Sequence, residues 1–292
     1  ATAAATAAAT VTAVTAGGAP PRWVLGATQA SAAEAAAQLG FVRERRAPAL
    51  AWAVHAVQAL LAARCRRCGG DGGGGDGGAG GNGGTAARPM QVLQLGCGRG
   101  DLVLELARAH RGLRVVGVDS SAYALGRARA RAEAAGLQNA RFVCEDAGRL
   151  QLELAGGGTS GELRALLDGV DVVVAVGACG GLNDAALSLA SARRASCLVW
   201  PCCYGKHAEL SPADARWGVR EDEAALLCGM ADGGDGCAAA PAARRVIGAL
   251  RLAAAARRRP RARVGMCTAP AHPCTAQGAA TALWVEDSDE VY

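Results

Sequence analysis

The chain has 292 residues, of which 51% are hydrophobic, so it is long enough for one large α/β domain with an extension. Aromatic residues make up only 3% of the sequence, which argues against a surface that stacks unpaired bases. The net charge of +5 permits a nucleic-acid partner without requiring one. Twelve cysteines are too dilute for a disulfide scaffold, and no run of about eighteen strongly apolar residues indicates a membrane span. We therefore expect an intracellular protein with reduced thiols and no membrane partner.

The N-terminal third divides by composition. Residues 1–30 predict a disordered, low-complexity segment, which is either a tail or the remnant of an organellar transit peptide. Cytoplasmic localisation is the first expectation and an organelle is the alternative. Residues 31–68 predict a helical segment, because apolar residues recur at helical spacing. The glycine-rich stretch 69–89 predicts a flexible linker that leads into a domain over 90–292.

Strands and helices alternate from residue 91 onward. Expected strands lie at 91–96, 114–119, 141–146, 171–177, 196–204, 261–268 and 281–287. Expected helices between them lie at 101–110, 123–136, 161–168 and 184–194. Apolar strands that alternate with helices predict a Rossmann-like, doubly wound, mostly parallel sheet of seven strands. The last two strands have no room for a helix between them, so they predict an antiparallel hairpin at one sheet edge.

A glycine-rich turn follows the first expected strand. Gly96, Gly98 and Gly100 are spaced G-x-G-x-G, with Cys97 inside the turn, whereas dinucleotide sites use G-x-G-x-x-G. Asp101 comes next, and an acid at a helix start is unhelpful for binding pyrophosphate. S-adenosylmethionine has no phosphate and carries positive charge, so the turn favours that ligand over a nicotinamide dinucleotide.

Acidic residues end the next two expected strands. Asp119 can accept hydrogen bonds from both ribose hydroxyls, and Asp146 beside the small Ala147 can meet the adenine edge. The turn and both acids fall at the carboxyl ends of adjacent strands, where open α/β sheets bind ligands. Together they predict an S-adenosylmethionine site formed by Gly96, Cys97, Gly98, Gly100, Asp119, Asp146 and Ala147.

These segments resemble the first three motifs of class I methyltransferases: VLQLGCGRGDLVLELA, VVGVDSS and FVCEDA. The resemblance implies a Rossmann-like fold and an S-adenosylmethionine cofactor. Gln94 is a departure, because the family usually has an acid there that helps to hold the methionine amine.

The second half resembles the methyltransferase domain of the glutathione S-transferase C-terminal domain-containing proteins. The fifth-strand motif PCCYGK is intact at 201–206, and a late CTAQ at 274–277 resembles the group's T-P-K-N. The fourth-strand motif is partly kept, since Gly177 replaces the usual His and Asn183 replaces the usual Thr. The RNA-modifying relatives of this group imply RNA, with tRNA first, as the substrate.

Methyl transfer requires orientation of the nucleophile and, for some acceptors, removal of a proton. Asp184 and Lys206 are the proton-handling candidates, and Tyr204 is a candidate for orienting the substrate. A less favoured alternative is covalent catalysis by Cys202 or Cys203, with a thiol pKa lowered by Lys206 or His207.

No metal site is expected, because adjacent cysteines chelate one ion poorly and the C-x-x-C at 65–68 has no second pair. Arginines near 127–131 and 257–263 are candidates for phosphate contact. Two other functions remain open: a catalytically degenerate binding protein with this fold, and a nicotinamide oxidoreductase, which the glycine spacing disfavours.

Overall fold

The computed structural model describes residues 46–68, 88–154, 161–211, 217–233, 237–270 and 280–286. Their main element is one β-sheet. The strands are β1 (Gln91–Leu95), β2 (Arg114–Asp119), β3 (Ala140–Cys144), β4 (Val172–Cys179), β5 (Ser196–Cys203), β6 (Arg263–Ala269) and β7 (Ala280–Glu286). The predictions for 1–45, the 69–87 part of the linker and the 274–277 motif lie outside the described residues.

The seven described strands form a single sheet in the order β3-β2-β1-β4-β5-β7-β6. β1 to β5 pair in parallel, and β7 runs antiparallel to both β5 and β6. The predicted doubly wound sheet with a C-terminal antiparallel hairpin is confirmed. The chain reverses its direction of travel across the sheet between β1 and β4, so a crevice opens at their carboxyl ends.

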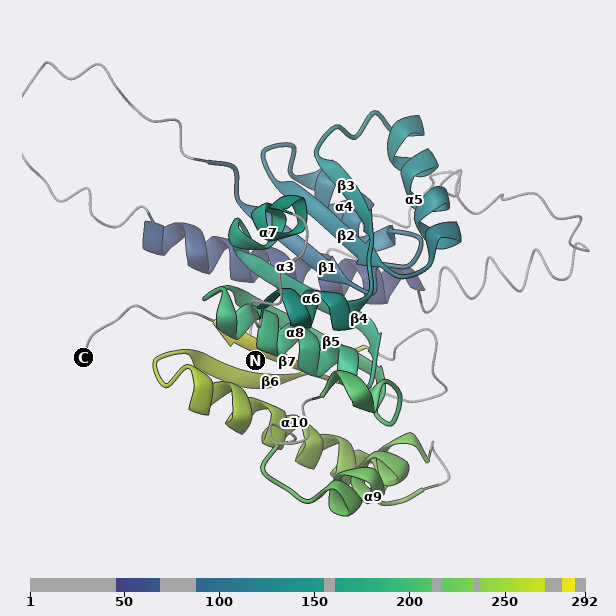
Figure 1. Cartoon of the computed structure of the whole chain (residues 1–292), viewed down its shortest axis with the longest axis vertical. Helices are drawn as coiled ribbons and strands as arrows, with labels where there is room; N and C mark the ends of the chain where they lie inside the picture. Colours follow the sequence, from purple (N-terminus) through teal and green to yellow (C-terminus); the bar gives the residue numbers. More distant parts are fainter. Residues whose placement is uncertain are drawn as a thin grey trace, which may run out of the picture.

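Helices cover both faces of the sheet (Figure 1). They are α3 (Ala47–Cys68), α4 (Asp101–Ala109), α5 (Ala122–Ala134), α6 (Ala147–Leu154), α7 (Gly161–Asp168), α8 (Gly181–Ala192), α9 (Glu221–Asp232) and α10 (Ala240–Arg258), with a short 3₁₀ turn η3 (Ala208–Leu210). None of the described helices is both long and apolar enough to cross a bilayer.

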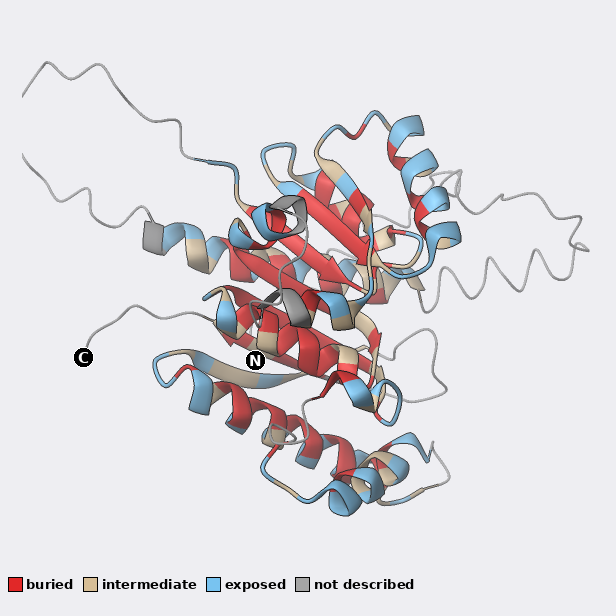
Figure 2. Cartoon of the chain, in the orientation of Figure 1, coloured by how far each residue is buried: buried red, intermediate tan, exposed pale blue. Residues whose placement is uncertain are grey.

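Alternate residues of each strand supply two separate hydrophobic layers, because successive side chains in a strand point to opposite faces. In β1, Val92 joins the layer formed with α3, α4 and α5, whereas Leu93 and Leu95 join the layer formed with α7, α8 and α10. Figure 2 shows the sheet buried between these two layers. The carboxyl ends of the strands are therefore held rigidly from both sides.

Helix α3 packs directly on the sheet, although the glycine-rich stretch lies between them in sequence. Ala53 and Val57 are fully buried in the layer that also contains Trp200 of β5. Trp52 meets Trp200 edge to face, with ring centroids 4.9 Å apart. The start of α3 thereby lies near the carboxyl ends of the strands.

Three helices were not predicted from the sequence: α6, α9 and α10. Helix α10 is rich in alanine and arginine, which obscure the apolar pattern formed by Val246, Ile247, Leu250 and Leu252. α9 and α10 pack on each other around Ile247, Ala243 and Trp217. This pair extends the domain beside the carboxyl end of β5.

A buried carboxylate fastens the opposite, amino ends of the strands. Asp171 accepts hydrogen bonds from Arg88 Nη1 and Nη2 at 2.8 Å each, from Arg64 Nε at 3.2 Å and from the backbone N–H of Gln91 at 2.8 Å. Burial raises the pKa of Asp171, but Arg88, the Gln91 N–H and Arg64 together lower it by more. The pKa of Asp171 therefore lies below the ordinary value.

We predict that Asp171→Asn lowers the free energy of unfolding by about 2–4 kcal/mol at neutral pH, because it leaves two arginines without their charge partner. The contribution of Asp171 is present above its unfolded pKa of about 3.9 and is lost as the pH falls through the lower folded pKa. The deficit, measured by urea denaturation, should therefore shrink below about pH 4. The matched control is Asp168→Asn, which removes the exposed partner of Arg193 and should cost about 0–1 kcal/mol. Equal losses in both variants would contradict this account.

Candidate active site

Two adjoining hollows open at the carboxyl ends of the strands. The first has a volume of about 280 Å³ and the second about 290 Å³, and both are lined by Gly96 and Gly177. Each alone lies near the lower limit for small-molecule sites, which run from about 300 to 1,000 Å³. Because they share these lining residues, the two hollows adjoin each other at the carboxyl ends of β1 and β4.

The glycine turn separates the two hollows. Gly96, Gly98 and Gly100 all have left-handed backbone, with φ of 65°, 52° and 76°. The N–H of Gly98 donates to Asp119 Oδ2 at 2.8 Å, so the turn is tied to the end of β2. Cys97 is buried beneath it, where burial and the charge of Asp119 raise the pKa of its thiol to about 12. Cys97 is therefore a packing residue rather than a nucleophile.

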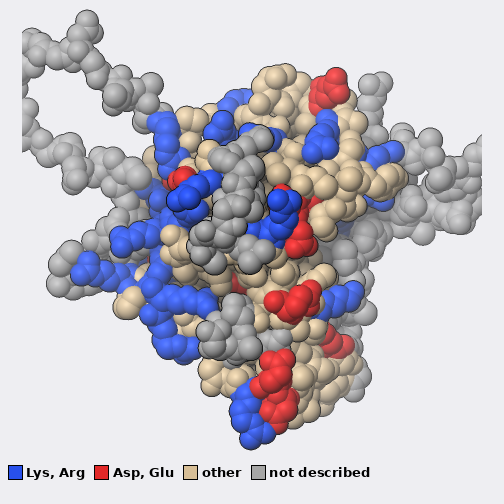
Figure 3. All heavy atoms as spheres, viewed as in Figure 1, with Lys and Arg blue, Asp and Glu red and all other residues tan. Residues whose placement is uncertain are grey.

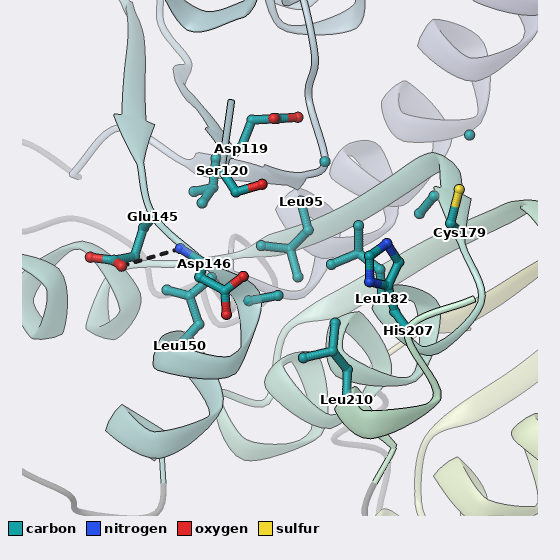
Figure 4. A pocket seen from close by; sticks show the side chains of 15 residues that line it. Leu95, Asp119, Ser120, Glu145, Asp146, Leu150, Cys179, Leu182, His207 and Leu210 are labelled. Atoms are coloured by element: carbon teal, nitrogen blue, oxygen red, sulfur yellow. Dashed lines mark hydrogen bonds between the residues drawn. The ribbon is translucent and has the colours of Figure 1, made fainter. Parts of the chain in front are cut away.

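The acids predicted for the nucleoside line the first hollow. Asp119 and the neighbouring Ser120 form one wall, and Asp146 with Leu150 forms another (Figure 4). Asp119 Oδ1 also accepts from the N–H of Ser121 at 2.9 Å, and Asp146 Oδ1 accepts from the N–H of Gly148 at 2.7 Å. Each carboxylate is thus fixed by backbone donors and keeps lone pairs for a ligand. Ala147 lies in the same wall.

The second hollow contains an unsatisfied polar atom. Gln94 is 4% exposed, and its buried Oε1 has no hydrogen-bond partner among the described residues. Such an orphaned acceptor is costly unless a donor reaches it. An ammonium group in this hollow would supply the donor, so Gln94 fits the methionine amine of S-adenosylmethionine even though it is not an acid.

The acid at the start of α4 is paired with two arginines, so it does not act on such a ligand as a free negative charge. Asp101 pairs with Arg131 at 2.7 Å and with Arg46, the residue before α3. The pairing places the guanidinium of Arg46 in the lining of the second hollow, where it can meet a carboxylate. The two hollows together thus offer partners for ribose hydroxyls, an amine and a carboxylate.

Close backbone packing shapes the far wall of the first hollow. A Cβ on Gly180 would lie 1.7 Å from the carbonyl oxygen of Lys206, and one on Gly181 would lie 1.8 Å from that of His207. The N–H of Gly181 donates to the Lys206 carbonyl at 2.9 Å. Asn183 is buried, and its side-chain amide donates to the carbonyls of Ala178 and Gly180. These two hydrogen bonds hold the turn.

Two of the predicted catalytic residues, Asp184 and Tyr204, line a separate hollow beside α9. The carboxylate of Asp184 accepts from Arg251 Nε and Nη2 at 2.9 and 2.8 Å and from Trp217 Nε1 at 2.9 Å, and it lines neither of the two hollows. Tyr204 is buried beside α9, and its backbone N–H donates to Asp232. Lys206 is exposed on the loop after β5. A proton-handling role for Lys206 stays a prediction, whereas Asp184 and Tyr204 hold structural positions.

His207 is a residue that the sequence analysis did not place in the site. It lines the first hollow, and its Nδ1 lies 3.3 Å from Glu209 Oε1. Figure 4 shows its ring beside Leu182, on the side of the hollow opposite Asp119. The signal was its position in the loop directly after β5, but nothing local in the sequence shows that this loop folds back over Gly181.

The surroundings of Cys202 and Cys203 do not favour the alternative of a covalent mechanism, which needs a lowered thiol pKa. Burial and the neighbouring Cys179 raise the pKa values of Cys202 and Cys203 above the ordinary thiol value, so Lys206 and His207 do not make them thiolates. The covalent alternative is thus unsupported for the thiols as they stand.

The fold is that of a Rossmann-like methyltransferase, and its crevice opens at the carboxyl ends of β1, β2, β3 and β4. Residues 92–195 match the family described as "Methyltransferase domain". The chain therefore contains a class I, S-adenosylmethionine-dependent methyltransferase domain.

Individual relatives match less. A tRNA (guanine-N(7)-)-methyltransferase of Rubrobacter xylanophilus is 44% identical over 59 residues, which cover 20% of this chain. The match spans about a quarter (26%) of that relative's length. Magnesium protoporphyrin IX methyltransferase from Synechocystis PCC 6803, solved with S-adenosylhomocysteine, is 16% identical with a TM-score of 0.40, and 91% of each chain is covered. The bifunctional kinase-methyltransferase WbdD is 16% identical with a TM-score of 0.40, covering 82% of this chain and 40% of that one.

We predict that Gly180→Ala destabilises the wall of the first hollow, because the new Cβ collides with the Lys206 carbonyl at a backbone conformation that L-residues avoid. The expected loss is about 2–4 kcal/mol in the free energy of unfolding, measured by denaturant titration. The matched control is Gly126→Ala on α5, where no atom lies within 4 Å of the new Cβ, and it should stabilise by about 0.5–1 kcal/mol. A neutral Gly180→Ala would show that the two backbones do not pack so closely.

Proposed function

We propose that this chain transfers the methyl group of S-adenosylmethionine to RNA, with tRNA as the first substrate class to test. Three observations support S-adenosylmethionine as the methyl donor: the family match, the orphaned Gln94 oxygen and the carboxylates of the first hollow. Two observations support RNA as the methyl acceptor: the local match to a tRNA methyltransferase, and the resemblance of 201–206 to a group with RNA-modifying relatives. The local tRNA match is the observation that carries the choice of RNA.

Surface charge also favours a polyanionic acceptor. Exposed arginines gather where α3 and α10 end, at the amino ends of β4, β5 and β6, and include Arg66, Arg88, Arg194, Arg258, Arg261 and Arg263. Figure 3 shows Lys and Arg side chains gathered on the left of that view. Several arginines predicted for phosphate contact are instead used internally, since Arg129 donates to the Phe142 carbonyl and Arg259 to the Ala195 carbonyl. The exposed set lies away from the crevice, so only an acceptor as long as a folded RNA reaches both.

Within the first hollow, we assign proton transfer to His207. S-adenosylmethionine supplies the methyl group, which passes to an acceptor atom as the carbon–sulfur bond breaks. The imidazole of His207 takes the proton that the acceptor loses, and Glu209, 3.3 Å away, stabilises the resulting imidazolium. His207 thereby serves where the family's fourth-strand His is replaced by Gly177. Gly177 has φ 70° at a register shift in β4, a conformation that a histidine there would adopt only with strain.

The proposal is tested by incubating the purified chain with radiolabelled S-adenosylmethionine and either total tRNA or an unrelated protein mixture. We expect label that ribonuclease releases, and none in the protein mixture. Cofactor binding without transfer to any RNA fraction would contradict the RNA assignment and favour a catalytically degenerate binding protein.

We predict that His207→Gln lowers kcat for RNA methylation by about 10²- to 10⁴-fold, because glutamine cannot accept the proton. The dissociation constant for S-adenosylmethionine should change less than about threefold, since the glutamine amide keeps a polar group at the hollow. His55→Gln, on the exposed side of α3, is the matched control and should leave both quantities unchanged. An unchanged kcat in His207→Gln would remove this residue from the reaction.

A further inference from the structure

Three cysteine sulfurs converge where β4 and β5 end. Cys179 Sγ lies 3.3 Å from Cys202 Sγ, and the Sγ atoms of Cys179, Cys202 and Cys203 all lie within 4.8 Å of one another. Within the part of the chain that the structure describes, this is the one cluster of three or more His, Cys, Asp or Glu ligand atoms with such spacing. The methyl-transfer chemistry described above uses none of these sulfurs.

The backbone explains how two adjacent cysteines reach one point. β4 and β5 shift register between Val176 and Ala178 and again between Ala178 and Cys179, after which Cys179 pairs with Cys203. The chain then turns sharply, because the Asp232 carboxylate accepts from the N–H groups of Tyr204 and Gly205 at 2.8–3.2 Å. The regular alternation of side chains across the sheet ends at this bulge. At this bulge the sulfurs of two adjacent cysteines therefore approach the same point, beside Cys179 Sγ.

We propose that Cys179, Cys202 and Cys203 bind one thiophilic divalent metal ion of the zinc type. A tetrahedral ion with metal–sulfur bonds of about 2.3 Å separates its sulfurs by about 3.8 Å, so Cys179 Sγ and Cys202 Sγ must move apart by about 0.5 Å and no pair needs to approach by more than about 1 Å. All three residues are partly buried, which shields the ion from water without closing the site.

The thiols must lose their protons when an ion binds. Burial, together with the hydrogen bonds and charges of the neighbouring cysteines, raises the pKa values of the Cys202 and Cys203 thiols. Up to three thiol protons therefore leave to solvent as three metal–sulfur bonds form. Affinity must therefore rise with pH.

The site adjoins the crevice. Cys179 also lines the first hollow, so an ion held by its sulfur lies at the edge of the crevice. Figure 4 shows the Cys179 side chain beside the hollow, across from Asp119. Three protein ligands leave a fourth position for water or a substrate atom, the pattern of zinc sites that take part in binding or chemistry.

The test is a titration of the full chain with Cd²⁺ alone, in a Cys65→Ser/Cys68→Ser background that removes the C-x-x-C. Sulfur-to-cadmium charge-transfer absorbance should saturate at one equivalent, and Zn²⁺ should displace it. Cys179→Ser and Cys202→Ser should each weaken the affinity at least tenfold, and lowering the pH should weaken it in the parent. Cys267→Ser, another partly buried cysteine outside the cluster, is the matched control and should bind as the parent does.

Equal stoichiometry and affinity in Cys179→Ser and the parent would overturn the proposal. So would the absence of saturable binding in the parent, or a Cys179–Cys202 disulfide found by mass spectrometry in protein purified with reductant. Circular dichroism and S-adenosylmethionine binding check that each variant is folded. If Cys179→Ser does not fold, Cys203→Ser provides the same comparison from the other strand.

Discussion

A buried arginine ties the outer helices to the wall of the crevice. Arg251 of α10 is 1% exposed and donates to both carboxylate oxygens of Asp184 and to the carbonyl of Gly180 at 3.0 Å. Its guanidinium lies 5.1 Å from the ring of Trp217 and 5.8 Å from that of Tyr204. Burial lowers the pKa of Arg251, but the charge and hydrogen bonds of Asp184, with further contributions from Tyr204 and Cys228, together raise it above the ordinary value, so the guanidinium stays charged. Taking two ions out of water costs several kcal/mol each, and this geometry offsets that cost with directed hydrogen bonds.

The fixed carbonyl of Gly180 sets the rest of the site. It holds the turn at the start of α8, onto which the backbone at Lys206 and His207 packs without room for a side chain. That contact brings His207 into the first hollow and keeps Cys179 beside Cys202. Asp184 thus supports the site indirectly, because its partner Arg251 holds the wall of the crevice in place. The loop after β5 supplies the groups that face the ligand.

The sheet could be predicted from the sequence, and so could the meeting of Gly96, Asp119 and Asp146 at one edge of it, because the signals are local. A short apolar run that ends in glycine or an acid, as at Gly96 and Asp119, indicates both a buried strand and the end of it that faces a ligand. The apolar residues of α10 were obscured by the alanine and arginine that make up most of the helix. The bonding of Asp184 could not be predicted from the sequence, because its partner Arg251 lies 67 residues away. The cysteine cluster depended on two register shifts that no residue pattern encodes.

Binding of S-adenosylmethionine to the purified chain, measured by calorimetry, tests the central claim most directly. The account predicts micromolar affinity for S-adenosylmethionine and S-adenosylhomocysteine. Asp119→Asn should lose at least tenfold in affinity, because the amide no longer accepts from both the Gly98 N–H and a ribose hydroxyl with a full charge. Asp222→Asn, an exposed acid on α9, should bind as the parent does. Absence of binding to either compound, or full binding by Asp119→Asn, would contradict the account.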